Sequence, residues 1–314
     1  MNQAVSIASL LPDECHLCPR DCGARRARGE TGVCGAADTL RLARASLHLW
    51  EEPLISGHAG RGTIFFSGCP LRCVYCQNAS IALGETGKSV SFERLVEIML
   101  ELQSKHALNI NCVTPTHYTP VIIAAVHAAR EQGLQLPVVW NTSGYELGQT
   151  IAELKGTADV FLTDFKYGSP RLARSYSHAP DYPQRALAAL EEMLACVGRP
   201  VLDEYEGQER MVKGVVVRHL LLPGHLEDSK QVVRMVYERF GDDLILSLMN
   251  QYTPVLKPTS SAAQHYPSLL TRPSEDEYEA LLDYADALGV EDYFWQEGET
   301  AQESFIPPFD YSGL

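Results

Sequence analysis

The stretch FFSGCPLRCVYCQN, residues 65–78, places Cys69, Cys73 and Cys76 in the pattern C-x3-C-x2-C. Three cysteines crowded together are typical of a metal site, yet a closed structural site takes four ligands. A cubane of four irons and four sulfides needs one ligand per iron, so three thiolates leave one iron with an open coordination position. An open position distinguishes a reactive metal site from a structural one. A three-cysteine zinc site is the alternative.

The composition is that of a soluble globular protein, with 314 residues of which 45% are hydrophobic and 21% charged. No apolar run approaches the roughly 18 residues that a membrane span needs. The first residues lack the basic and apolar regions of a signal peptide. We therefore expect a cytoplasmic protein with no membrane partner. The net charge of −14 argues against binding to nucleic-acid backbones.

Six short apolar runs alternate with amphipathic helices after residue 60. They are near-continuously apolar and rich in Val and Ile, which is typical of strands buried on both faces of a parallel sheet. Ser91 is a candidate N-cap, and Ser274 with Glu277 a candidate capping box. Six right-handed β-α units are two short of a closed barrel, so we predict an α/β fold, a partial (β/α)6 TIM-like barrel. The runs are 62–69, 109–115, 136–144, 159–167, 212–224 and 244–254.

Polar residues stand at the carboxyl end of every apolar run. In barrels of this kind the chemistry lies at the carboxyl ends of the strands. Loop starts explain any one polar end, but six in register predict a site at one rim. These ends are Ser67–Cys69, Thr114–His117, Asn141–Gly144, Asp164–Lys166, Arg218–His219 and Asn250–Tyr252.

A second set of cysteines lies near the start of the chain, at Cys15, Cys18, Cys22 and Cys34. In a reducing compartment such clustering indicates a metal rather than disulfides. A zinc ion with four thiolates and a second iron–sulfur cluster both fit this set. Zinc would make the segment a structural clip, and a cubane would make it an electron relay.

We predict three parts of the chain: a Cys-rich N-terminal module at 1–60, the partial barrel at 61–290, and a C-terminal tail at 291–314 that packs on the barrel. The alternating stretch LRLARASLHLW within the module predicts a strand with one solvated face. Cys112 and Cys196 lie outside both cysteine sets and are predicted to be small buried hydrophobic residues. One basic cluster is either a solvated loop or a docking patch for an acidic partner. It consists of Arg20, Arg25, Arg26 and Arg28.

The motif GCPLRCVYCQN after the strand TIFF resembles the cluster loop of the radical S-adenosylmethionine (SAM) superfamily. The chain resembles most the activating enzymes of glycyl-radical enzymes, such as pyruvate formate-lyase activase, and within them an activase-related branch labelled PflX-type. The resemblance covers nearly the whole chain. The segments that carry it are CHLCPRDCG, LHLWEEPLISG, GTIFFSGC, VTPTHYTP, NTSGYE, DFKY, VRHLLLPGH and FIPPFD.

The resemblance implies a [4Fe–4S] cluster on Cys69, Cys73 and Cys76, with SAM as the ligand of the open iron. One electron, from a reductant such as flavodoxin or ferredoxin, then cleaves SAM to methionine and a 5′-deoxyadenosyl radical, which abstracts a hydrogen atom. The protein supplies orientation and a dry cavity.

The resemblance also implies roles for the residues at the rim. Tyr75 contacts the adenine. Thr114, Thr116 and His117 occupy the strand-two position where the superfamily holds the SAM amino group with a Gly-Gly-Glu-like motif, although this chain has no carboxylate there. For His117, packing in the core is the alternative.

The later strands complete this implied site. Asn141 and Thr142 match the pair beside the SAM ribose. Asp164 and Lys166 match the Asp-x-Lys of the activases, in which the lysine reaches the SAM carboxylate. Arg218 can fork onto the same carboxylate. His219, for which core packing is again the alternative, lines the adenosine or substrate side of the pocket together with Gln251 and Tyr252.

Three functions follow as hypotheses. The first is a radical SAM enzyme that installs a glycyl radical on a partner protein, as the resemblance suggests. The second is a radical SAM catalyst that abstracts hydrogen from a small molecule or another macromolecule. The third is a non-catalytic iron–sulfur protein for electron transfer or sensing, which needs neither an open iron nor a polar barrel rim.

Overall fold

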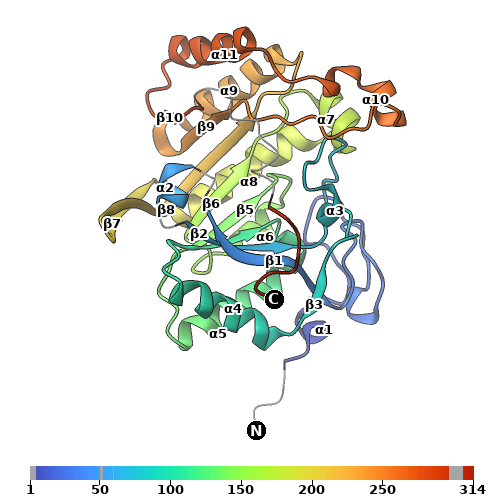
Figure 1. Ribbon diagram of the computed structural model, residues 1–314, viewed down its shortest axis with the longest axis vertical. Coiled ribbons are helices and arrows are strands. Elements are labelled where there is room, and N and C mark those ends of the chain that lie inside the picture. Colours follow the sequence, from blue (N-terminus) through green and yellow to red (C-terminus); the bar gives the residue numbers. More distant parts are fainter. Residues whose placement is uncertain (1–4, 50–51, 59, 297–306) are drawn as a thin grey trace.

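The computed structural model describes residues 5–49, 52–58, 60–296 and 307–314 (Figure 1). Its centre is one sheet with the strand order β10-β9-β8-β6-β5-β4-β2-β1-β3. Consecutive members from β2 to β9 pair in parallel, and the sheet is open because β10 and β3 form its two edges. The predicted α/β fold with a partial barrel is thereby confirmed. The parallel strands are β2 (Arg61–Phe66), β4 (Ile110–Val113), β5 (Val138–Thr142), β6 (Val160–Asp164), β8 (Gln208–Leu220) and β9 (Ile245–Met249).

The main helices follow the amphipathic segments of the sequence. Ser91 caps α4 by accepting the backbone N–H of Arg94, and Ser274 and Glu277 form the expected capping box at α11. In Figure 1, α4 and α5 cover one part of the sheet, and α9 and α11 lie together at the other end of the molecule. These helices are α4 (Phe92–Ser104), α5 (Thr119–Glu131), α8 (Tyr182–Val197), α9 (Leu226–Phe240) and α11 (Glu275–Leu288).

Short helices fill the remaining connections of the described chain. Except for α7, they are shorter than the roughly seven residues that two turns of α-helix need, so their sequences show no helical period. They are α1 (Ile7–Leu10), α2 (Pro53–Ser56), α3 (Ala79–Ala82), α6 (Gly148–Ala152), α7 (Pro170–Ser177) and α10 (Ser261–His265).

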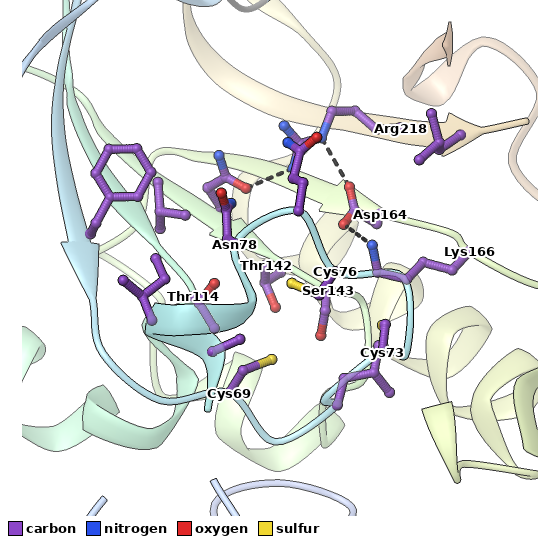
Figure 2. A pocket seen from close by; sticks show the side chains of 18 of the residues that line it. Cys69, Cys73, Cys76, Asn78, Thr114, Thr142, Ser143, Asp164, Lys166 and Arg218 are labelled. Carbon is purple, nitrogen blue, oxygen red and sulfur yellow. Dashed lines mark hydrogen bonds and ion pairs between the residues drawn. The ribbon is translucent and has the colours of Figure 1, made fainter. Parts of the chain in front are cut away.

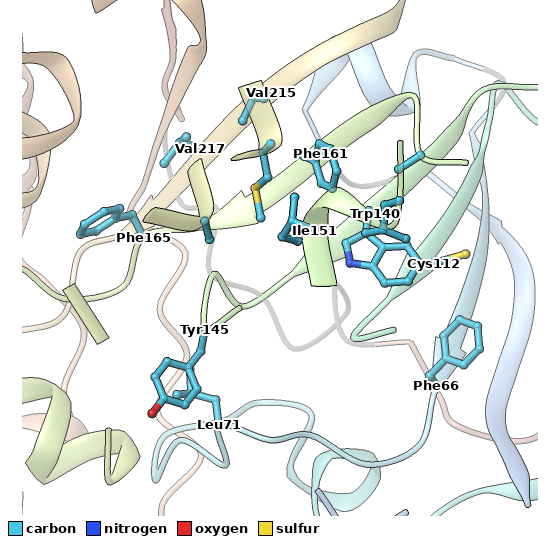
Figure 3. Packing of buried hydrophobic residues seen from close by; sticks show 14 of the residues in the cluster. Phe66, Leu71, Cys112, Trp140, Tyr145, Ile151, Phe161, Phe165, Val215 and Val217 are labelled. Atoms are coloured by element: carbon cyan, nitrogen blue, oxygen red, sulfur yellow. The ribbon is translucent and has the colours of Figure 1, made fainter. Parts of the chain in front are cut away.

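Two faces of the sheet hold different residues because side chains alternate along a strand. Trp140, Phe161, Val215 and Val217 belong to the large core in which the sheet meets its helices (Figure 3). Their neighbours along the strands face the inside of the barrel. There a smaller apolar cluster contains Val139, Leu162 and Val216, with Ile55 of α2 packed against them. Asn141, Asp164 and Arg218 come two residues later on the same strands, so the inner face turns polar at the carboxyl ends.

The N-terminal region contributes to the same sheet. β1 (Leu40–His48) pairs antiparallel with β2 and with β3 (Lys88–Val90). The predicted module at 1–60 therefore shares a sheet with the predicted barrel. The cysteine-rich segment 12–38 lies outside the sheet and contains one 3-10 turn at Arg26–Arg28.

The C-terminal segment contacts two separate strands of the sheet, β9 and β1. β10 (Tyr293–Phe294) adds in parallel to β9. Residues 297–306, which include the beginning of the FIPPFD motif, lie outside the described part of the chain. The last residues pack on β1, where Tyr311 donates its N–H to the carbonyl of Ala43 at 3.1 Å and Ser312 accepts from Ala45 at 2.9 Å. The end of the tail thus contacts a strand of the predicted N-terminal module.

The two isolated cysteines differ in burial. Cys112 on β4 is fully buried, as predicted. Cys196 on α8 is only partly buried, with its Sγ 3.5 Å from the carbonyl of Ile151. The prediction that Cys196 is buried holds only in part, because it packs against the core from the last turn of α8. Among the described helices, none has both the length and the apolar character needed to cross a membrane.

Candidate active site

A cavity of about 240 Å³ opens at the carboxyl ends of the parallel strands. Most of the predicted rim residues line it, together with Tyr252 and with Pro307 of the tail. Thr116, His117 and His219 are not among its lining residues. The predicted residues that it brings together are Cys69, Cys73, Tyr75, Cys76, Thr114, Asn141, Thr142, Asp164, Lys166, Arg218 and Gln251 (Figure 2).

The three cysteines of the first motif lie on one loop directly after β2. The loop is fixed through its backbone, since Cys69 donates its N–H to Cys34 at 3.0 Å and Val74 to Tyr176 at 2.8 Å. Burial, together with the neighbouring Cys73, raises the thiol pKa of Cys69 to about 11 and that of Cys76 to about 12. These thiols become good ligands when a cation compensates the loss of their protons.

A charged network faces the cysteines across the cavity (Figure 2). Asp164 accepts from Lys166 Nζ at 2.6 Å and from Arg218 Nε at 3.0 Å, and Arg218 Nη2 also donates to Asn141 at 2.7 Å. Burial alone would raise the pKa of Asp164, but the two cations outweigh it and hold that pKa below its usual value. Two cations share one carboxylate, so the three side chains carry one net positive charge. Such a wall suits an anionic group such as a carboxylate.

A family model described as the radical SAM superfamily matches residues 63–236, more than half of the chain. The chain belongs to the radical SAM superfamily. The resemblance of its sequence to that superfamily is thereby confirmed.

Individual relatives are more distant. An uncharacterised protein of Methanocaldococcus jannaschii is 26% identical over 296 residues, which are 91% of this chain and 78% of that protein. The pyruvate formate-lyase-activating enzyme of Clostridium pasteurianum is 26% identical over 187 residues, 58% of this chain and 69% of that enzyme. The solved structure of a radical SAM methyltransferase from Sphaerobacter thermophilus matches with a TM-score of 0.49 and 14% identity, covering 76% of this chain and 67% of that one.

Membership of the radical SAM superfamily implies a [4Fe–4S] cluster and SAM. The residues of the cavity fit both groups. Thiolates are the usual ligands of iron–sulfur clusters, and Cys69, Cys73 and Cys76 all line this one cavity. SAM carries a carboxylate, for which Lys166 and Arg218 provide a cationic wall.

A buried carboxylate beside the radical SAM cavity escaped the sequence reasoning. Glu146 is almost fully buried in the loop after β5, and its Oε1 accepts from Thr116 at 2.6 Å and from the hydroxyl of Thr142. Burial raises the pKa of Glu146 to about 7, although both hydroxyl donors act to lower it. The segment 114–117, directly after β4, lacks a carboxylate of its own, yet the fold brings one to Thr116 from the loop after β5. In the sequence, the only sign of this buried carboxylate is an acidic residue shortly after a polar strand end.

Two further residues reach the cluster loop from another part of the chain. Ser177, at the end of α7, donates its hydroxyl to Cys73 Sγ at 3.0 Å. Tyr167 is 2.6 Å from the same hydroxyl, and both side chains are fully buried. Tyr167 ends the DFKY segment but Ser177 belongs to no motif, so only the tertiary fold shows the contact of Ser177 with a cluster cysteine.

The two histidines of the rim are held by backbone carbonyls. His117 Nε2 lies 2.9 Å from the carbonyl of Ser67, and burial together with Arg26 lowers its pKa to about 3. His219 Nδ1 lies 2.7 Å from the carbonyl of Phe165, and burial lowers its pKa as well. These contacts favour the core-packing alternative for both.

The basic cluster of the N-terminal segment is neither a solvated loop nor one surface patch. Arg26 is fully buried, donates to the carbonyl of His117 and lies over the ring of Tyr118. Arg20 donates to the carbonyls of Pro70, Leu71, Ser177 and His178 at 2.6–3.2 Å. Only Arg25 and Arg28 are exposed. The two inward arginines attach the cysteine-rich segment to the barrel.

The cysteines of both sets are free thiols. Within the described ranges, no three His, Cys, Asp or Glu side chains converge on a point that could hold a single metal ion. This holds for the N-terminal set and also for the three cysteines of the cavity.

Proposed function

We propose that this protein is an enzyme that reductively cleaves SAM at a [4Fe–4S] cluster held by Cys69, Cys73 and Cys76 and uses the resulting radical for hydrogen abstraction. One observation carries the proposal: three thiols on one loop share a cavity with the network of Asp164, Lys166 and Arg218. The free state of all the cysteines agrees with a cytoplasmic enzyme, since disulfides are rare in reducing compartments.

When bound, the cluster supplies one electron that splits the SAM sulfonium into methionine and a 5′-deoxyadenosyl radical. The chain's own residues orient the cosubstrate. Lys166 and Arg218 bind the SAM carboxylate, while Asp164 holds both cations in place through its two oxygens. Asn141 fixes the guanidinium of Arg218 from the neighbouring strand. This arrangement is preorganised because every member is already hydrogen-bonded inside the cavity wall.

The remaining wall residues bind the rest of SAM. Tyr75 is buried, with its ring edge-on to the ring of Tyr252. Tyr75 and Gln251 line the adenosine side of the cavity. The Thr142 hydroxyl donates to Glu146, so its oxygen keeps its lone pairs and can accept a hydrogen bond from the SAM amino group in the cavity that Thr142 lines. Thr114 lines the same wall, and Thr116 acts from behind it through Glu146.

Anaerobic reconstitution tests this proposal. Protein loaded with iron and sulfide, reduced with dithionite and supplied with SAM, is expected to form 5′-deoxyadenosine and methionine in equal amounts. The variants Cys73→Ala and Lys166→Met should lose this product, whereas Cys196→Ala, at the partly buried cysteine of α8, should keep it. A wild-type protein with an intact cluster and no 5′-deoxyadenosine would show that it is a non-catalytic iron–sulfur protein.

For the target of the radical we propose a glycyl-radical enzyme, with this chain as the activating enzyme of a PflX-type branch. The distant similarity to a pyruvate formate-lyase-activating enzyme supports this assignment. Flavodoxin or ferredoxin is the proposed reductant. A glycyl-radical EPR signal on a co-expressed partner, with one SAM consumed per radical formed, is the expected result. Repeated turnover of a small molecule or another macromolecule, without such a signal, would favour the second hypothesis.

A further inference from the structure

We propose that Cys15, Cys18, Cys22 and Cys34 hold a second iron–sulfur cluster that passes electrons to the cluster on Cys69, Cys73 and Cys76. The inference rests on the proposed function, because a relay needs an acceptor in the cavity. Four thiolates are a complete ligand set for a cubane, so this second site has no open iron and would act in electron transfer alone.

The fold gathers the four thiols of this segment. Cys15 donates its N–H to Ala24 and accepts from Gly23, both at 3.1 Å, so the chain turns back on itself around Cys18 and Cys22. A methyl group on Gly32 would lie 3.4 Å from Cys34 Sγ and 3.5 Å from Cys22 Sγ. Both thiols therefore lie close to the backbone of Gly32.

Loading requires the four cysteine side chains to turn toward one another. The thiols do not converge on one ion-sized point in the described structure. A cysteine sulfur turns about a single bond with three staggered positions, so the backbone decides whether four thiols can close on a cluster. Here the backbone brings the thiols of Cys22 and Cys34 next to the same residue, Gly32.

The segment touches the cluster loop directly. The carbonyl of Cys34 accepts the N–H of Cys69 at 3.0 Å, so one hydrogen bond joins a cysteine of each set. A side chain on Gly68 would lie 2.7 Å from that same carbonyl, which explains why a glycine allows the two backbones to approach so closely. This contact gives electrons a short path from one set of thiolates to the other.

A purely structural metal explains this placement less well. Structural metals order segments that have few other contacts. Here Arg20 donates to four backbone carbonyls of the barrel, and buried Arg26 adds bonds to the carbonyls of Ala37 and His117. The segment is already attached by these bonds, so the contact with Cys69 points to electron transfer.

The exposure of the thiols gives the relay a direction. Cys22 is exposed, whereas Cys15 and Cys34 are buried, and Cys34 contacts the cluster loop. An external one-electron protein reductant is oxidised at the exposed side, and the second cluster gains its electron. That electron moves on to the cavity cluster, which returns the second cluster to its oxidised state.

The test uses the full chain, reconstituted anaerobically with iron and sulfide, with zinc also counted. A variant with Cys69, Cys73 and Cys76 all changed to Ala is expected to retain about half of the wild-type iron and sulfide, because two cubanes carry equal amounts. Its EPR signal after reduction should not respond to SAM. Cys196→Ala should keep the full wild-type content.

The complementary variant, Cys15→Ala with Cys18→Ala, should lose the SAM-insensitive signal. Its ratio of flavodoxin-driven to dithionite-driven 5′-deoxyadenosine formation should fall several-fold, since dithionite is small enough to reach the cavity cluster directly. Cys22→Ser, at the exposed position, should give the same fall if the double variant does not fold.

Zinc without iron in the triple variant, no metal at all, or an unchanged reductant ratio would each overturn the relay. In all three cases wild-type protein would still cleave SAM, so the proposed function would survive. The absence of 5′-deoxyadenosine from fully loaded wild-type protein would instead refute the proposed function.

Discussion

The buried carboxylate of Glu146 makes the stability of the protein depend on pH in a predictable direction. Its pKa is about 7 in the folded protein against an ordinary value of 4.5. The folded state therefore holds a proton on Glu146 between these values, whereas the unfolded state has released it. Stability is full below pH 4.5 and is lost as the pH rises through 7, because ionising a buried carboxylate is unfavourable. The loss amounts to about 3 kcal/mol, at 1.36 kcal/mol per pKa unit.

Glu146→Gln removes this titration and keeps the shape of the side chain. We expect the free energy of unfolding of the variant, measured by urea denaturation, to gain on wild type by about 3 kcal/mol between pH 4.5 and 8. Other titrating groups cancel in this difference. Glu30→Gln is the matched control, because exposed Glu30 bonds to Arg25 and its pKa is lowered, which moves its effect below pH 4.5. A difference that stays flat from pH 5 to 8, or that falls with pH, would refute the reasoning.

Three more predictions concern the walls of the cavity. Asp164→Asn leaves Lys166 and Arg218 without their carboxylate, so urea denaturation should show a loss of about 3–5 kcal/mol. Glu191→Gln, which breaks the exposed pair with Arg239, should cost at most about 1 kcal/mol, and equal losses would contradict the role of burial. Thr114 has a φ of 56°, a left-handed conformation that is costly for a β-branched residue, so Thr114→Gly should stabilise the protein by about 1 kcal/mol, and a lower melting temperature would contradict this strain. Ser177→Ala removes the hydrogen bond to Cys73, and that bond stabilises the more negative, reduced cluster. An EPR redox titration should therefore show a cluster reduction potential lower by up to about 100 mV. Ser175→Ala, on the same helix, should leave the cluster potential unchanged.

The strands and the long helices could be predicted because their signals are local. A buried parallel strand needs a run of apolar residues, and a helix needs a cap and an apolar stripe, so each can be found within about fifteen residues. The protruding strand β7 (Val201–Tyr205) was not predicted. Its residues are mostly exposed and it pairs only with the early part of β8, so it carries neither burial nor a clear alternation.

The cavity residues on strand ends could be predicted for a related reason. Parallel strands bring their carboxyl ends to one edge, so Asn141, Asp164 and Arg218 meet there whatever the loops do. Glu146 and Ser177 reach the site from a loop and from a helix end, whose positions depend on how distant segments pack. Thr116 and His117 could not be separated from Thr114 by sequence, because a turn after Thr114 rotates them away from the cavity.

Lys166 connects the two halves of the site through its charge. Burial would lower its pKa, but the Asp164 carboxylate and then the Cys73 thiolate raise it, so the ammonium stays charged. In return, Lys166 is among the groups that lower the thiol pKa of Cys69 and Cys76. One cation therefore favours both the thiolates that bind a cluster and an anion held against the opposite wall. Asp164 also accepts a hydrogen bond from Arg218. The same carboxylate therefore keeps Lys166 in place and orients the second cation. Cluster loading and anion binding are thus linked through a single carboxylate at the end of β6.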